Sequence, residues 1–308
     1  MSTLEVVTPQ VAVPAPCAED LAVSFEIFPP KSDAADTKLW AELARLARLE
    51  PAFVSVTYGA GGTTQERTLS TVERLRRETS IPPAAHLTCV GAARGEIDDL
   101  ARGYWEAGVR HIVALRGDPQ EAGGYTPHPE GYAYAADLVA GLRRVAPFEI
   151  SVAAYPEVHP EAGTARHDLD NLKRKIDAGA DRAITQFFFE PEPFLRFRDR
   201  AAAAGITAPI LPGILPIVDF DRARGFAERC GASIPAWLPP LFEGLSDDDD
   251  TRTLVATVAA CELCRQLREE GVEAFHFYTL NRAELTTAIC RSLRYPVPIT
   301  RTPVGGRR

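Results

Sequence analysis

The chain has 308 residues, of which 45% are hydrophobic and 25% charged, as is ordinary for a globular enzyme. Its formal net charge of −8 argues against a broad surface for nucleic acid or an anionic membrane, so we expect neither as a partner. No apolar run approaches the roughly 20 residues that span a bilayer, and the N-terminus lacks the pattern of a signal peptide, so we expect a cytoplasmic protein.

Short apolar runs rich in β-branched residues alternate with helical patterns along the chain. Such runs are typical of buried parallel strands. We predict strands at 22–28, 52–58, 84–90, 111–115, 149–155, 182–189, 210–215 and 274–280. We predict helices at 33–49, 64–79, 96–108, 131–145, 165–179, 192–204, 219–231, 251–271 and 282–293, with a further short helix near 235–242. The acidic run 247–250 fits a helix start better than a metal site.

This alternation, without an interior linker, indicates an α/β protein with a (β/α)8 TIM barrel. A doubly wound sheet is the alternative, but it would usually have fewer strands and a G-x-G-x-x-G motif after the first one. Here the first strand ends in Phe28-Pro29-Pro30-Lys31. We expect one catalytic barrel over residues 21–295, a flexible N-terminal tail at 1–20 and a C-terminal tail at 296–308.

The cysteines and histidines form no clear redox or metal motif. Cys261 and Cys264 make a C-x-x-C inside a helical pattern, with no second pair, so buried packing is favoured over a redox or zinc role. The histidines include no H-x-H and no H-E-x-x-H. We therefore expect no metal.

Glu26 is the strongest catalytic candidate. In a TIM barrel the active site lies at the C-terminal ends of the strands, and Glu26 lies near such an end within the apolar run 23–28. Burying a polar group without a partner costs about 1–3 kcal/mol. Burial also favours the protonated carboxyl, the form that a general acid needs near neutral pH. A structural glutamate paired with an arginine of the barrel is the alternative.

Other candidate residues, polar except for Gly117, occupy or follow the remaining strand ends, namely Thr57, Tyr58, His86, Thr88, Arg116, Gly117, Asp118, Tyr155, Gln186, His276, Tyr278, Asn281 and Arg282. For Asp118, the role of an ordinary turn aspartate is an equally good interpretation. For His86, the role of a histidine packed in the core is equally good. His159 lies in a loop, which favours a functional role. Asp168, Asn171 and Lys175 share one face of a helix, although a solvated surface is the better interpretation of that pattern alone.

Seven segments, spread over roughly residues 20–295, resemble bacterial flavin-dependent methylenetetrahydrofolate reductase. They are 23–31, 53–59, 115–118, 152–160, 177–189, 212–216 and 275–282. The resemblance implies that NADH or NADPH reduces bound FAD, which then reduces 5,10-methylenetetrahydrofolate to 5-methyltetrahydrofolate in the same site. This ping-pong hydride relay feeds methionine synthesis, and a homo-oligomer is compatible with it. A barrel that binds flavin or folate, has lost catalysis and serves as a partner protein is the alternative.

The resemblance also implies roles for individual residues. Glu26 would be the acid that opens the folate ring to an iminium, and Asp118 would lie near flavin and folate. The FAD site would comprise Thr57, Tyr58, Ala60, His86, Arg116, Gly117, Asp118, Tyr134, Ala135, Tyr155, His159, Ala162, Asp168, Asn171, Arg174 and Lys175. The substrate site would comprise Gln186, Arg222, Phe226, Tyr278 and Arg282. The chain departs from the family at Arg222, where a glutamine often contacts substrate, and at 60–63.

Overall fold

The computed structural model of the chain describes residues 21–58, 65–118, 124–217 and 219–295. In these residues eight parallel strands close into a barrel in chain order, and the first strand pairs with the last. The strands are β1 (Ala22–Ile27), β2 (Phe53–Val56), β3 (Pro83–Thr88), β4 (His111–Leu115), β5 (Glu149–Ala154), β6 (Arg182–Phe187), β7 (Ile210–Ile214) and β8 (Ala274–Tyr278). The predicted (β/α)8 TIM barrel is confirmed.

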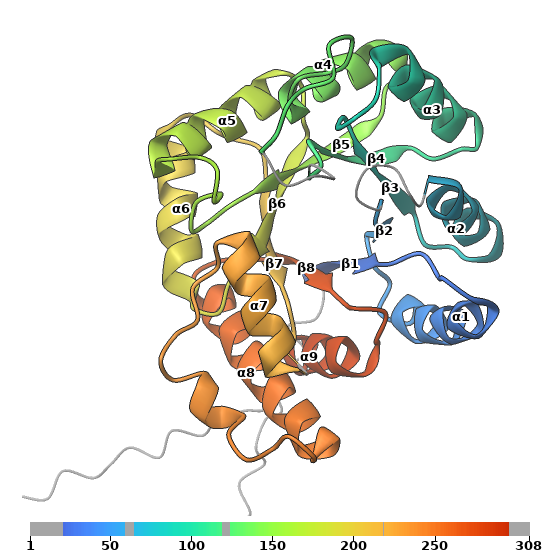
Figure 1. Ribbon diagram of the computed structural model, residues 1–308. Helices are drawn as coiled ribbons and strands as arrows, with labels where there is room; N and C mark the ends of the chain where they lie inside the picture. The colour runs from blue at the N-terminus through green and yellow to red at the C-terminus, as the bar shows by residue number, and fades with distance from the viewer. Residues whose placement is uncertain (1–20, 59–64, 119–123, 218, 296–308) are drawn as a thin grey trace, which may run out of the picture.

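Helices surround the barrel on its outside, and the blue β1 lies beside the red β8 (Figure 1). The helices are α1 (Asp33–Ala47), α2 (Gln65–Glu78), α3 (Arg94–Glu106), α4 (Ala135–Val145), α5 (Ala165–Asp177), α6 (Pro191–Ala203), α7 (Phe220–Cys230), α8 (Asp249–Glu269) and α9 (Glu284–Arg294). The short helix predicted near 235–242 is a single 3₁₀ turn, η2 (Pro239–Leu241). The two predicted tails lie outside the described residues.

Several helix starts differ from the predicted ones by one to four residues, and capping explains two of these differences. Helix α4 begins four residues later than the predicted 131, because the Asp137 carboxylate accepts the N–H of Tyr134 at 2.9 Å and holds Tyr134 extended. Helix α8 begins at Asp249, two residues early, because Asp248 accepts the N–H of Thr251 at 2.9 Å. The acidic run is therefore a helix start.

Apolar side chains of the described residues form a large shell between strands and helices and a separate small cluster inside the barrel. Side chains alternate along a strand, so Phe25 and Ile27 of β1 join the shell, whereas Ser24 and Glu26 face the interior. The inner cluster contains Phe53, Ala84, Val113 and Ile184. Buried polar residues of the strands include Ser24, Ser55, His86, His111, Ser151, Thr185 and His276. The interior of this barrel is thus largely polar.

Membrane-spanning helices and metal-binding clusters are both absent from the described ranges. There, no helix combines the length and the apolar character needed to cross a membrane. The described His, Cys, Asp and Glu residues form no group of three or more that could hold a metal ion. Cys264 lies buried in α8, as the packing interpretation predicts, and Cys261 is half-buried.

Candidate active site

Glu26 lies in the barrel between two buried histidines. Its Oε2 atom lies 3.4 Å from Nε2 of His86 on β3 and 3.9 Å from Nε2 of His276 on β8. On its other side, the His276 ring makes a 2.8 Å hydrogen bond through Nδ1 to the Ser24 hydroxyl. Among the ion pairs of the described residues, Glu26 has these histidines as partners and no arginine. The alternative of a structural Glu–Arg pair is therefore not supported.

The histidine that lies nearer to Glu26 is uncharged at neutral pH. Burial lowers the pKa of His86, and this effect exceeds the opposing attraction of Glu26. The Nε2 atoms of His86 and His276 are both buried, and neither has a hydrogen-bond partner among the described residues. Glu26 therefore faces a neutral imidazole rather than a fixed cation, an arrangement suited to a carboxyl group that exchanges a proton.

Cationic and aromatic side chains gather on one side of the barrel mouth, after β4 and β5. Arg116 pairs with Glu161 across these two loops, and its guanidinium carbon lies 4.4 Å from the centroid of the Tyr125 ring. The pairing with Arg116 lowers the pKa of Glu161. Asp118 is exposed beside this pair and interacts electrostatically with Tyr155. The structure thus brings several predicted cofactor residues together.

His159 connects the cationic and aromatic side chains at the mouth to helix α5. Its ring lies 4.6 Å from that of Tyr155, and its backbone N–H donates to Asp168 at 2.9 Å. Burial lowers the pKa of His159, and the nearby Arg116 lowers it further. Asp168 therefore fixes the loop that carries His159 to the first turn of α5.

Lys175 points inward rather than toward solvent. Its ammonium group donates to the carbonyl oxygen of Ala153 on β5, and burial lowers its pKa to about 8. Arg174 next to it is exposed and bonds to Asn171. The interpretation of this helix face as solvated surface is therefore wrong for Lys175, because the helical pattern alone does not reveal the long reach of its side chain.

The remaining cofactor candidates lie around the same mouth. Thr57 and Tyr58 follow β2 and are half-buried, Tyr134 and Ala135 begin α4, and Ala162 is buried in the loop before α5. Gly117 has a φ of 86°, and a Cβ there would lie 2.5 Å from the Val90 side chain, so the turn after β4 requires glycine. Ala60 lies outside the described residues.

The substrate candidates lie further round the mouth, on β6, on α7 and on or after β8. Gln186 is half-buried on β6, and the next residue, Phe187, stacks with Phe226 of α7 at 5.2 Å. Tyr278 of β8 donates its hydroxyl to the carbonyl of Thr185 at 2.7 Å. These contacts place the α7 aromatic ring over the end of β6.

Two substrate candidates are arginines with acidic neighbours. The Arg222 side chain is 88% exposed and pairs only loosely with Asp219, at 3.3 Å. Arg282 is half-buried and bonds to Glu284 at 3.0 Å. Such weak surface pairs exchange readily for a carboxylate ligand.

Sequence reasoning missed four polar residues of the barrel and its mouth. Ser24 shares the inward face of β1 with Glu26, so the strict alternation of that strand was the available signal. Glu161 and Tyr125 hold Arg116, but they lie in loops that give no periodic signal. His111 also escaped attention; it bonds to Ser151 at 2.7 Å, and burial lowers its pKa to about 3.

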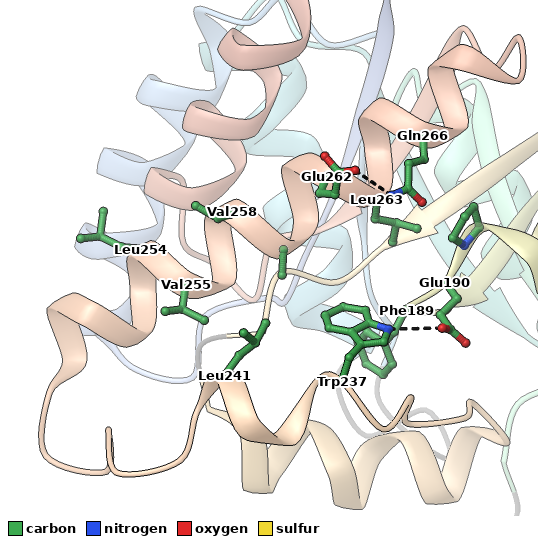
Figure 2. A pocket seen from close by; sticks show the side chains of 12 residues that line it. Phe189, Glu190, Trp237, Leu241, Leu254, Val255, Val258, Glu262, Leu263 and Gln266 are labelled. Carbon is green, nitrogen blue, oxygen red and sulfur yellow. Dashed lines mark hydrogen bonds between the residues drawn. The ribbon is translucent and has the colours of Figure 1, made fainter. Parts of the chain in front are cut away.

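An apolar groove of about 670 Å³ lies away from the mouth, between α8, η2 and the end of β6. Figure 2 shows Leu254, Val258 and Leu263 along α8, with Trp237 opposite them and bonded to Glu190. Catalytic sites combine an apolar wall with several convergent polar groups, and few polar groups converge here. We therefore place the candidate active site at the barrel mouth.

Comparison with known proteins gives consistent matches over most of the chain. A family model described as methylenetetrahydrofolate reductase matches residues 13–294. The 5,10-methylenetetrahydrofolate reductases of Salmonella typhimurium and Escherichia coli are each 53% identical over 271 residues, covering 88% of this chain and 90% of theirs. An uncharacterised Clostridium thermocellum protein, described as binding two copies of 5-methyl-5,6,7,8-tetrahydrofolic acid, has a TM-score of 0.61 at 16% identity. It covers 90% of this chain and 95% of its own, and this likeness supports the fold alone.

Proposed function

Because the chain belongs to the methylenetetrahydrofolate reductase family, we propose that it reduces 5,10-methylenetetrahydrofolate to 5-methyltetrahydrofolate, using FAD and either NADH or NADPH. The observation that supports this most strongly is the position of Glu26, inside the barrel beside the neutral His86. A ping-pong order in the cytoplasm, supplying methyl groups for methionine, completes the proposal.

The residues on the β4–β5 side of the mouth fit a flavin dinucleotide. The buried ammonium of Lys175 and the guanidinium of Arg116 would offset a diphosphate in this net-acidic chain. Asp168 and Asn171 on α5 offer acceptors for a ribose, and Tyr155 offers an aromatic face. When bound, FAD would supply a two-electron carrier between nicotinamide and folate.

Glu26 would supply the proton that opens the five-membered ring of the folate substrate. Ring opening needs an acid at the departing nitrogen, and it produces the iminium that accepts hydride. His86 and His276 would hold the carboxyl group in place from two sides, and Ser24 would orient His276 through its 2.8 Å hydrogen bond. Asp118, exposed at the mouth, would influence the charge of the reacting groups.

The other side of the mouth would hold nicotinamide and folate in turn. Gln186 would hydrogen-bond to either ligand, and Phe226 would stack on it from α7. Arg282, and also Arg222 in place of the usual glutamine, would pair with the carboxylates of the folate tail. Tyr278 would line the floor between them, fixed by its bond to Thr185.

A simple spectroscopic test separates the reductase from a barrel that has lost catalysis. We expect the purified protein to be yellow, to bind added FAD and to oxidise NADH or NADPH with menadione as acceptor. The same preparation should then form 5-methyltetrahydrofolate from methylenetetrahydrofolate. A colourless protein that takes up no FAD and turns over neither nucleotide would refute the proposal. A yellow protein without turnover would support the catalytically inactive alternative.

FAD affinity should fall as the pH rises above about 8. Because the pKa of Lys175 is about 8 instead of the usual 10.5, half of its positive charge is lost at that pH and nearly all of it well above. Loss of this charge should weaken FAD binding roughly tenfold between pH 7 and 9.5. Fluorescence titration of FAD across this range measures the effect.

Variants of α5 test whether Lys175 is responsible. Lys175→Met should weaken FAD binding at pH 7, make it less sensitive to salt and abolish its pH dependence. Lys173→Met is the matched control, because Lys173 pairs with Asp177 on the same helix. Arg174→Ala should have a smaller effect, since Arg174 is exposed. A pH profile that persists unchanged in Lys175→Met would contradict this assignment.

A further inference from the structure

The end of helix α7 is joined to the loop that follows β5. The half-buried Glu157 accepts the backbone N–H of Ser233 at 3.0 Å, across 76 residues of sequence. Gly231 ends α7 with a φ of 73°. A Cβ on Gly231 would lie 3.0 Å from the carbonyl oxygen of Val158 and 3.2 Å from the Pro160 ring, so the loop and the helix end are in direct contact.

The loop itself holds an unfavourable backbone conformation. Val158 has a φ of 82°, a region that β-branched residues rarely adopt. Such a conformation persists only where neighbouring contacts determine it. Here Glu157 binds the end of α7 on one side, and His159 binds Asp168 of α5 on the other. We call residues 157–159, with Gly231 and Ser233, the clasp.

The clasp connects the two halves of the proposed active site. Its loop includes His159, whose electrostatic neighbours are Arg116, Asp168, Glu161 and Asp118. Its helix carries Phe226, which stacks on Phe187. A narrow crevice between loop and helix is lined by Tyr155, Gln186, Phe187 and Cys230, together with Glu157, Val158 and Gly231 of the clasp. The position of α7 over the substrate side is thus set by a contact with the cofactor side.

We propose that Glu157 is a positioning residue that aligns α7 with the cofactor loop and so sets the affinity for both substrates without touching either. This inference rests on the proposed function. Removing the carboxylate leaves the Ser233 N–H without its partner and frees the helix end. Phe226 would then be misplaced over the ligand, whereas Glu26 and its histidines, on β1, β3 and β8, would remain in place.

The test is a comparison of KM and kcat in three variants of the full-length flavoprotein. Glu157→Ala should raise KM for nicotinamide and for methylenetetrahydrofolate about fivefold to tenfold, with kcat within about twofold. Glu157→Gln should restore a near-normal KM, because its amide oxygen still accepts the Ser233 N–H. Glu192→Ala on α6, which removes a 63% exposed glutamate paired with Arg196, is the matched control and should leave both constants unchanged.

A second measurement reports directly on the hydrogen bond between Glu157 and Ser233. Amide hydrogen exchange in the peptide that contains Ser233 should be faster in Glu157→Ala than in the parent and Glu157→Gln. An unchanged KM in Glu157→Ala would overturn the proposal, as would an equal fall of kcat in Glu157→Ala and Glu157→Gln. If the parent chain neither retains FAD nor reduces methylenetetrahydrofolate, the proposed function fails instead. That failure would be seen in the parent chain, before any substitution is made, so it is distinguishable from a failure of the role proposed for Glu157.

Discussion

Glu26→Gln is expected to lose at least ~10²-fold in the rate of folate reduction, while reduction of bound FAD by nicotinamide stays within about tenfold. The two half-reactions differ in their need for a proton, because hydride transfer to oxidised flavin needs no acid at the folate ring. Glutamine keeps the size of the side chain and most of its contacts with His86 and His276. A folding defect should therefore be small.

Stopped-flow absorbance of the flavin measures each half-reaction separately. Glu192→Gln, the same change at an exposed side chain of α6, serves as control and should affect neither rate. If Glu26→Gln slowed both half-reactions equally, Glu26 would be structural or would position the flavin. If folate reduction survived at the parent rate, a different acid or a water molecule would have to deliver the proton.

Gly213→Ala should strongly destabilise the fold through a clash inside the barrel wall. A Cβ on Gly213 would lie 2.1 Å from the carbonyl oxygen of Thr185 and 2.6 Å from the Tyr278 ring. The Thr185 carbonyl cannot retreat freely, because it accepts the Tyr278 hydroxyl and belongs to β6, which pairs with β7. Overpacking of this kind costs about 3 kcal/mol, or more where backbone is involved.

Thermal unfolding measures this loss, and the melting temperature should fall by roughly 6–12 °C. Gly103→Ala is the matched control, because a Cβ at Gly103 in helix α3 meets no atom within 4 Å. It should leave the melting temperature unchanged or raise it slightly, since alanine favours helix. Equal melting temperatures for Gly213→Ala and the parent would show that β6 and β7 can separate without cost.

Periodicity was sufficient to predict the barrel and the position of Glu26. The strands are buried on both sides and short, so their apolar runs are distinct, and each boundary differs from the structure by no more than two residues. Glu26 is conspicuous because its strand is otherwise nearly apolar. Both features depend on neighbours in the sequence, which is why they can be read from it.

Contacts between distant residues could not be predicted in this way. The bond between Ser24 and His276 joins residues 252 positions apart, and no pattern within either strand indicates that the two meet. Lys175 looks like a surface lysine until the carbonyl of Ala153 on the neighbouring strand is placed beside it. The clasp between Glu157 and Ser233 likewise depends on where α7 ends against the β5 loop.

The closure of the barrel by β1 and β8 has a consequence for synthesis on the ribosome. Five registered residue pairs link these strands, from Ala22 with Ala274 to Glu26 with Tyr278. A nascent chain that lacks β8 leaves one edge of β1 unpaired, and unpaired edges favour aggregation. Glu26 and His276 therefore meet only when the last strand is added, so a truncated chain should need chaperone protection rather than retain partial activity.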